Sequence, residues 1–260
     1  MKLTHLPPLL LTLLSVSSTY SALPQNNCHP FIDKKQDNYV IGYGSLMNEE
    51  SRSRTNPDVK QLTPVSVKGF VRDWNTMTPG YHIIYLGAVP CNAKEQHCFL
   101  NGLAYLASDV TATDERENVY CRQEVSHENL QPYKQEDSID PKAKYWIYIT
   151  KKEDMHQPDA QHPLIQSYVD LFIGGCIEQA ASIAHKKVSD LIFPDDYTFV
   201  FDCIHGTKGW TTTFWLNDRV YPARPWAASP YALKIDQILN NSYENNSITG
   251  QYPYMDIPYL

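Results

Sequence analysis

The sequence predicts an α+β protein, and three observations support this fold class. Between residues 38 and 150 the chain consists of short segments rich in β-branched and aromatic side chains, separated by turn residues, as in consecutive strands. One polar interruption, residues 108–120, has the capping residues and carboxylates of a short helix. Residues 162–187 then carry apolar side chains at helical spacing. We therefore expect a β-rich first part followed by a long helix.

Five segments of the first part have the composition of strands. They cover residues 39–45, 65–75, 81–89, 98–107 and 144–150. The whole chain has 18 tyrosines and 18 prolines against 11 glycines, which favours a β-rich protein with stiff connections.

The interruption at residues 108–120 predicts a helix that leads into a strand at residues 121–125. Its candidate N-cap residues are Asp109, Thr111 and Thr113. The carboxylates of Asp114, Glu115 and Glu117 would lie in the first turns, where the helix dipole favours negative charge. In the later helix, Pro163 suits the first turn and lysines follow at the end.

The chain after residue 190 predicts a smaller extension. Residues 197–204 and 210–218 have the composition of strands, and residues 229–241 suggest a short helix. Trp210, Trp215 and the segment 217–226 are expected to pack over the main domain, with a lid over a substrate as the alternative. The predicted organisation is a signal peptide at residues 1–22, a domain at 38–190 and a C-terminal extension at 191–260.

The first residues have the features of a secretory signal. Lys2 precedes an apolar run at residues 6–16, and small residues offer a cleavage site near Ser21 or Ala22. The run is shorter than the roughly 18 residues of a spanning helix, and Pro7 and Pro8 disfavour a buried N-terminal helix. The sequence predicts a secreted or periplasmic protein without a membrane span.

Charge and cysteine usage narrow the function classes further. The net charge is −7 and there is no lysine- or arginine-rich block, so we expect no nucleic-acid partner. Six cysteines in an exported chain are compatible with three disulfides. Cys91 and Cys98 bracket a polar segment between two expected strands and are the one pair that we predict. A zinc site is disfavoured because there is no Cys-x-x-Cys pair and His97 adjoins Cys98.

Common catalytic motifs are missing from the sequence. The stretch GYGSL is not the G-x-S-x-G of an α/β-hydrolase, and there is no glycine-rich phosphate loop. Pairing of Cys121 with His127, or of Cys203 with His205, would make a thiol-dependent hydrolase, although disulfides are the more common use of such cysteines. The histidines His156, His162 and His185 are expected to be scattered, in solvated or structural roles.

Two features remain as candidates for a site. The first expected strand stops at Tyr43, Gly44, Ser45 and Leu46, either in an ordinary turn or in a loop whose N–H groups face a ligand. The second is Glu117. It lies in a charged run that is normally a solvated helix face, but Thr113, Glu117 and Tyr120 would share one face of a helix. If Tyr120 is buried, Glu117 follows it inward and becomes a candidate general acid/base.

Four motifs resemble, in order, those of the gamma-glutamylcyclotransferase-like superfamily. They are YGSLM at residues 43–47, KGFVRDWN at 68–75, NGLAYLAS at 101–108 and DERENVYCRQEV at 114–125. The last is similar to the family pattern D-x-x-E-x-x-Y-x-R-x-x-V, which places Asp114, Glu117, Tyr120, Arg122 and Val125 in register. Tyr168 and Gly175 match the spacing of the family's late helix, and the resemblance spans residues 38–179.

The resemblance implies a small mixed β-barrel flanked by helices, with a cavity beside the loop at residues 43–46. It implies that backbone amides of this loop hold a small-molecule γ-glutamyl substrate and that Glu117 is the acid/base, without a metal or cofactor. Tyr120, a candidate substrate-binding residue, and Arg122 either line the site or belong to the barrel wall. Many relatives have glycine where this chain has Asn118 and Val119. Most relatives act inside cells, whereas this chain is expected to be exported. Glutathione is therefore no more plausible as its main substrate than γ-glutamyl peptides, γ-glutamyl amines or isopeptide-linked fragments. A binding module with the same cavity is the alternative, and the sequence makes no prediction of oligomeric state.

Overall fold

The structure is a computed structural model that describes residues 28–78, 80–92, 94, 97–210, 212, 214–223 and 230–244. The predicted signal peptide at residues 1–22 lies outside the described residues. None of the helices in the described ranges is both long and apolar enough to cross a membrane.

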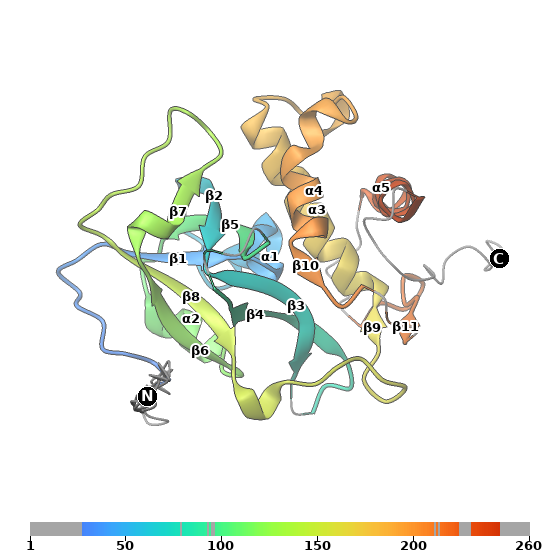
Figure 1. Cartoon of the computed structure of the whole chain (residues 1–260), viewed down its shortest axis with the longest axis horizontal. Coiled ribbons are helices and arrows are strands. Elements are labelled where there is room, and N and C mark those ends of the chain that lie inside the picture. The colour runs from blue at the N-terminus through green and yellow to red at the C-terminus, as the bar shows by residue number, and fades with distance from the viewer. Residues whose placement is uncertain are drawn as a thin grey trace, which may run out of the picture.

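The strands form a large mixed sheet and two smaller sheets (Figure 1). In spatial order the large sheet contains β6 (Tyr120–Val125), β8 (Lys144–Thr150), β1 (Asn38–Gly42), β5 (Phe99–Leu106), β2 (Leu62–Lys68) and β7 (Leu130–Pro132). The second sheet contains β10 (Thr207–Lys208), β3 (Phe70–Met77) and β4 (Ile84–Pro90), and the third pairs β11 (Trp215–Leu216) with β9 (Leu164–Ile165). β1 is parallel to β8 and antiparallel to β5, which makes the large sheet mixed.

The predicted α+β class is confirmed, while the pairing of the described strands gives separate sheets and no closed barrel. The expected strand at residues 65–75 is two strands, β2 and β3, which belong to different sheets. The break falls at Gly69, whose φ of +92° lies in the left-handed region that glycine adopts without steric cost. Gly69 therefore lets the chain leave the large sheet and enter the second one.

Five α-helices and five short 3-10 helices are described. The α-helices are α1 (Glu49–Ser53), α2 (Val110–Arg116), α3 (Gln166–Ile183), α4 (Thr198–His205) and α5 (Ala232–Glu244). The 3-10 helices are η1 (Ser45–Met47), η2 (His127–Asn129), η3 (Lys152–Asp154), η4 (Val188–Asp190) and η5 (Asp195–Tyr197). The predicted short helix in the extension corresponds to α5, and the predicted long helix corresponds to α3.

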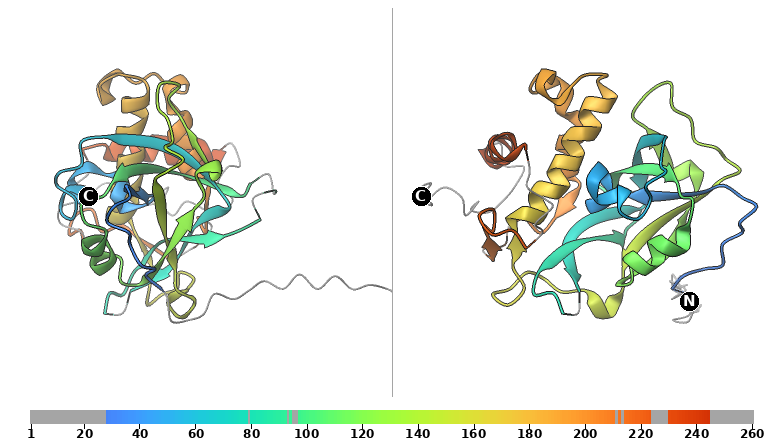
Figure 2. Two further views of the ribbon diagram at one scale, coloured as in Figure 1. Left: turned by 90° about the vertical axis from the view of Figure 1, so that its left-hand side faces the viewer. Right: turned by 180° about the vertical axis from the view of Figure 1, so that it is seen from behind.

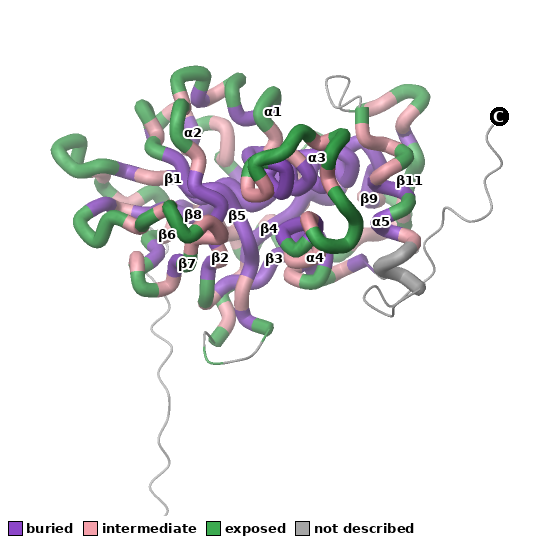
Figure 3. The backbone as a smooth tube through the Cα atoms, turned by 90° about the horizontal axis from the view of Figure 1, so that it is seen from above, coloured by how far each residue is buried: buried purple, intermediate pink, exposed green. Residues whose placement is uncertain are grey.

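Helix α3 lies at the centre of the molecule. It runs beside α4, next to the sheet that contains β3 and β4 (Figures 1 and 2), and most of its residues are buried (Figure 3). The indole of Trp74 on β3 meets the rings of Tyr168 and Phe172 on α3 and of Trp210 edge to face. Because α3 is buried on several sides, its position fixes the elements that contact it, including the loop after β1.

The segment at residues 197–204 was expected to be a strand, but it forms most of α4. The buried residues Phe199, Val200, Cys203 and Ile204 recur at helical spacing, so one face of a helix packs against α3. Its aromatic and β-branched composition favours strands only as a weak preference, and packing overrides it.

Three disulfides join all six cysteines. The predicted bridge between Cys91 and Cys98 is confirmed. Cys28 is bonded to Cys121, which ties the segment before β1 to β6, and Cys176 is bonded to Cys203, which ties α3 to α4. Three disulfides are typical of a protein from an oxidising compartment. Because Cys121 and Cys203 are both bonded, neither provides the thiolate that a thiol-dependent hydrolase needs.

Candidate active site

The loop after β1 turns at once into the 3-10 helix η1. Gly44 is its N-cap, and the first bond of the turn runs from the Met47 N–H to the Gly44 carbonyl at 3.0 Å. The amides of Ser45 and Leu46 precede that bond, so the turn itself gives them no acceptor.

Helix α3 and helix α1 hold this loop from behind. The Gln179 side chain donates to the Met47 carbonyl at 3.2 Å, and the Arg52 guanidinium donates to the carbonyls of Leu46 and Met47. Gly175 allows the close approach, since a Cβ at that position would lie 2.8 Å from the Asn48 nitrogen. The loop is therefore positioned by buried contacts and not by its own residues alone.

Tyr43 acts as a buried bridge between strands. Its hydroxyl donates to the Tyr148 carbonyl on β8 at 2.6 Å and accepts from the Ala88 N–H on β4 at 3.1 Å. Burial, followed by the nearby charge of Glu117, raises the pKa of Tyr43 well above its usual value. The phenol therefore stays protonated and keeps both bonds.

Glu117 lies immediately after α2. The helix begins after Asp109, whose side chain accepts the Thr111 N–H, and it ends at Arg116, with Glu117 as C-cap. The carboxyl side chain of Glu117 is only 15% exposed, and its Oε1 lies 3.1 Å from Arg116 Nε. The Arg116 guanidinium therefore lies beside a half-buried carboxyl group and favours its ionised form.

The prediction that Thr113, Glu117 and Tyr120 lie on one face of a helix is wrong in its geometry. The backbone leaves the helical region at Glu117 (φ −94°, ψ 39°), and Tyr120 is the first residue of β6. A turn nevertheless brings Tyr120 inward, because its N–H donates to the Glu117 carbonyl at 3.0 Å. The Tyr120 hydroxyl donates to the Leu86 carbonyl at 2.7 Å, and burial raises its pKa well above the usual value.

Arg116 joins the loop to Glu117, a role that the sequence analysis missed. Besides its contact with Glu117, its guanidinium donates to the Ser45 hydroxyl at 3.2 Å and to the Ser51 carbonyl at 2.6 Å. It also donates to Thr55. The sequence does not predict these contacts, because a charged run such as residues 114–117 usually forms a solvated helix surface.

The residues predicted for the site line one recess and an adjoining cavity. The recess has a volume of about 20 Å³, lined by Ile41, Tyr43, Gly44, Ser45, Leu46, Leu86, Glu117, Tyr120, Tyr148 and Tyr168. It adjoins a cavity of about 510 Å³, lined in part by Ser45, Tyr81, His82, Tyr85, Arg116, Glu117, Tyr120, Tyr168 and Ala223. Ser45, Glu117, Tyr120 and Tyr168 line both. The loop and the carboxylate, far apart in the sequence, thus meet at one place.

Arg122 does not line either space. Its guanidinium contacts Asp114 and the Pro30 carbonyl and lies over the Trp146 ring, 4.9 Å from the ring centroid. Tyr148 also donates to Asp114, at 2.6 Å. Asp114 and Arg122 of the DERENVYCRQEV motif, together with Tyr148 and Trp146 of β8, therefore hold α2 against β6 and β8.

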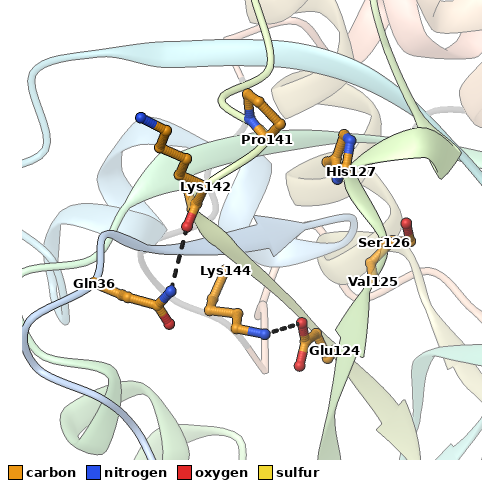
Figure 4. Close-up of a pocket in the computed structure, with 9 residues that line it drawn as sticks. Gln36, Glu124, Val125, Ser126, His127, Pro141, Lys142 and Lys144 are labelled. Carbon is orange, nitrogen blue, oxygen red and sulfur yellow. Dashed lines mark hydrogen bonds and ion pairs between the residues drawn. The ribbon is translucent and has the colours of Figure 1, made fainter.

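A second cavity, of about 750 Å³, lies where β6 ends and β8 begins, and Figure 4 shows the residues that line it. Its lining includes Gln36, Glu124, His127 and Lys142, and the Lys144 ammonium pairs with Glu124 across it. None of the predicted site residues contributes to this cavity. It is larger than the recess and its adjoining cavity, but the half-buried carboxyl group of Glu117 and the turn at Ser45 and Leu46 belong to the recess.

Comparison with known proteins gave solved structures only. No protein-family model and no curated protein sequence matches the chain. Similar structures include a gamma-glutamyl cyclotransferase, with 16% sequence identity and a TM-score of 0.42, over 62% of this chain and 90% of that chain. An uncharacterized protein from Homo sapiens has 16% identity and a TM-score of 0.41 over the same shares of the two chains. A gamma-glutamyl cyclotransferase specific to glutathione from yeast has 14% identity and a TM-score of 0.34, over 63% and 96%.

Proposed function

We propose that the protein cyclises γ-glutamyl amides or peptides, releasing 5-oxoproline and a free amine or amino acid, with Glu117 as general acid/base. The observation that supports the proposal is that Glu117 and the turn residues Gly44, Ser45 and Leu46 line one recess. A carboxyl that can accept and return a proton, opposite backbone donors, matches what an acyl transfer needs.

The reaction requires no covalent enzyme intermediate. The substrate's own α-amine attacks its γ-carbonyl, forming the C–N bond of a five-membered lactam, and the bond to the leaving nitrogen breaks. Glu117 takes a proton from the attacking amine and returns one to the leaving nitrogen, so the enzyme ends the cycle unchanged. Because nucleophile and carbonyl belong to one molecule, correct positioning supplies much of the rate.

The two spaces suit the two parts of such a substrate. The reacting carbonyl would lie at the recess, which has room for about one water-sized group. The amides of Ser45 and Leu46 would donate to its oxygen as negative charge develops there. The leaving group would occupy the larger cavity, whose wall includes Tyr81, His82 and Tyr85. That wall favours an amino acid or amine with an apolar or aromatic part.

The proposed location is outside the cytoplasm, secreted or periplasmic, consistent with the three disulfides.

We retain the domain division at residues 38–190 and 191–260 as part of the proposal. Residues 38–190 supply the loop, the carboxylate and most of both linings, and among the described residues Ala223 is the one lining residue from beyond them.

The test is product analysis with a panel of substrates. The purified protein and its Glu117→Gln variant would be incubated with γ-glutamyl dipeptides, glutathione, γ-glutamyl-ε-lysine and γ-glutamyl amines, and 5-oxoproline would be followed by mass spectrometry. Glu124→Gln is the matched control, because Glu124 pairs with Lys144 and lines neither the recess nor its adjoining cavity. We expect release by the wild type and by Glu124→Gln but not by Glu117→Gln. A folded wild type that releases 5-oxoproline from none of them would favour the binding module instead.

A further inference from the structure

Two histidines and an aspartate converge in the connection between η3 and β9. His156 Nε2 lies 2.8 Å from Asp159 Oδ2, and His162 Nδ1 lies 3.1 Å from Asp159 Oδ1. One nitrogen or oxygen of each residue lies within 4.8 Å of the others. His156 and His162 are not scattered as predicted from the sequence, because the chain folds back at Asp159 and brings their rings to a centroid distance of 5.0 Å.

Backbone hydrogen bonds hold this connection in place. At one end the His156 N–H donates to the Asn75 carbonyl at 2.9 Å, and at the other the Ile84 N–H donates to the Pro163 carbonyl at 3.1 Å. Within it, Asp159 Oδ1 accepts the N–H groups of Gln161 and His162, at 2.8 and 2.7 Å. The three side chains therefore stand on a segment whose path is fixed by strands β3 and β4.

We propose that His156, Asp159 and His162 form a binding site for a divalent transition metal, with Zn²⁺ as the best match. Imidazole nitrogens and a carboxylate oxygen are ligands that zinc accepts, at bond lengths of about 2.0 Å that separate tetrahedral ligand atoms by about 3.3 Å. The observed contacts of 2.8 and 3.1 Å to the two Asp159 oxygens are close to that separation, and one ligand atom of each of the three residues lies within 4.8 Å of the others. Three protein ligands leave a fourth position for water or another donor.

The proposed site borders the cavity of the candidate active site. The imidazole of His82, which lines that cavity, lies beside His162 with ring centroids 5.8 Å apart. A metal held by His156, Asp159 and His162 would thus stiffen a segment that supports one wall of the cavity. The metal site stands independently of the proposed cyclisation, because neither Glu117 nor the loop at Ser45 belongs to it.

Zinc binding by calorimetry tests the site without reference to activity. ZnCl₂ would be titrated into metal-free wild-type protein and into Asp159→Asn, His162→Gln and His185→Ala variants. Asp159→Asn keeps an oxygen for the two N–H donors, which protects the fold. His185 is the control, since it is exposed and pairs with Glu136 elsewhere. We expect the wild type to bind one Zn²⁺ per chain. The Asp159→Asn and His162→Gln variants should lose about tenfold or more in zinc affinity, whereas the zinc affinity of His185→Ala should equal that of the wild type.

Thermal unfolding with and without ZnCl₂ gives a second readout on the same proteins. Ligand that binds only the folded state stabilises it, so zinc should raise the midpoint of the wild type and of His185→Ala but not of Asp159→Asn. Absence of a stoichiometric site in the wild type would overturn the proposal. So would equal zinc affinity of Asp159→Asn and wild type, because binding would then come from other residues.

Discussion

At the scale of single residues, Arg116 connects the two parts of the candidate site. One guanidinium contacts the Ser45 hydroxyl on the loop and the Glu117 carboxyl after α2, and it also donates to Ser51 and Thr55. A planar group with five N–H donors can make these contacts together, whereas an ammonium on a flexible stem cannot. Arg116 is therefore a positioning residue as well as part of the cavity wall.

We predict that Arg116→Lys lowers kcat/KM for 5-oxoproline release by about 10- to 100-fold, because hydrogen bonds to charged groups each contribute about 1.5–3 kcal/mol. The control is Arg54→Lys, since Arg54 is exposed and pairs with Glu50 on α1. Steady-state rates measure the effect, and thermal midpoints show whether each variant is folded. Equal rates for Arg116→Lys and wild type would show that a positive charge alone suffices there.

Single residues also show how far sequence reasoning reached. Gly44, Ser45 and Glu117 could be named as candidates because a loop after a strand and a carboxylate in a family motif are local signals. Arg116 could not, because its partners at Ser45 and Ser51 are more than sixty positions away. His156 and His162 were overlooked for a different reason: their convergence depends on a turn at Asp159 that no spacing rule indicated.

At the scale of elements, the close packing of α3 against η1 fixes the loop that faces the recess. A Cβ at Gly175 would lie 2.8 Å from the Asn48 nitrogen and 3.0 Å from the Met47 carbonyl carbon. Both are backbone atoms, so they cannot move aside as a flexible side chain could. The helix and the loop must separate if this glycine is replaced.

We predict that Gly175→Ala lowers the free energy of unfolding by about 1–3 kcal/mol, the usual cost of overpacking a core. Ser182→Ala, at an exposed position in the last turn of α3, is the control and should change stability little. Chemical denaturation measures both. The prediction fails if Gly175→Ala is as stable as wild type, since alanine would then gain from its higher helix propensity without a compensating clash.

The sequence predicts a helix or strand correctly where its apolar or β-branched pattern extends over the whole element. The apolar spacing of α3 and the strand-like segments β1, β4, β5 and β8 were visible in the sequence. The split of residues 65–75 at Gly69 was not foreseen, because one glycine inside a strand pattern does not reveal a positive φ. The helix α4 was misassigned because its composition suits strands, while contact with α3 decides its conformation.

At the scale of the whole molecule, disulfides connect segments that are distant in the chain. The Cys28–Cys121 bridge spans 93 residues, and the Cys91–Cys98 bridge spans 7. Only the short bridge was predicted, because its partners flank one expected turn. The pairing of the other four cysteines depends on how the sheets and helices assemble, and local sequence carries no information on that.

We predict that replacing Cys28 and Cys121 by serine destabilises the protein more than the same replacement of Cys91 and Cys98. A longer loop restricts the unfolded chain more, which gives about 4.7 kcal/mol for the long bridge against about 2.5 kcal/mol for the short one in the chain-entropy model. Urea denaturation of the two double variants without reductant measures the difference. The opposite order of stabilities would show that native contacts, and not loop length, dominate the effect.

The central claim is that the substrate cyclises intramolecularly at the recess. The most direct test is to ask whether oxygen from water is incorporated into the product. The wild-type protein would be incubated with the best γ-glutamyl substrate in water enriched in a heavy oxygen isotope. Mass spectrometry would then measure how much heavy oxygen each product contains. Cyclisation predicts 5-oxoproline without heavy oxygen, because the α-amine and not water attacks the γ-carbonyl, and it predicts no product from Glu117→Gln. Glutamate that carries heavy oxygen would mean that water is the nucleophile and would contradict the account.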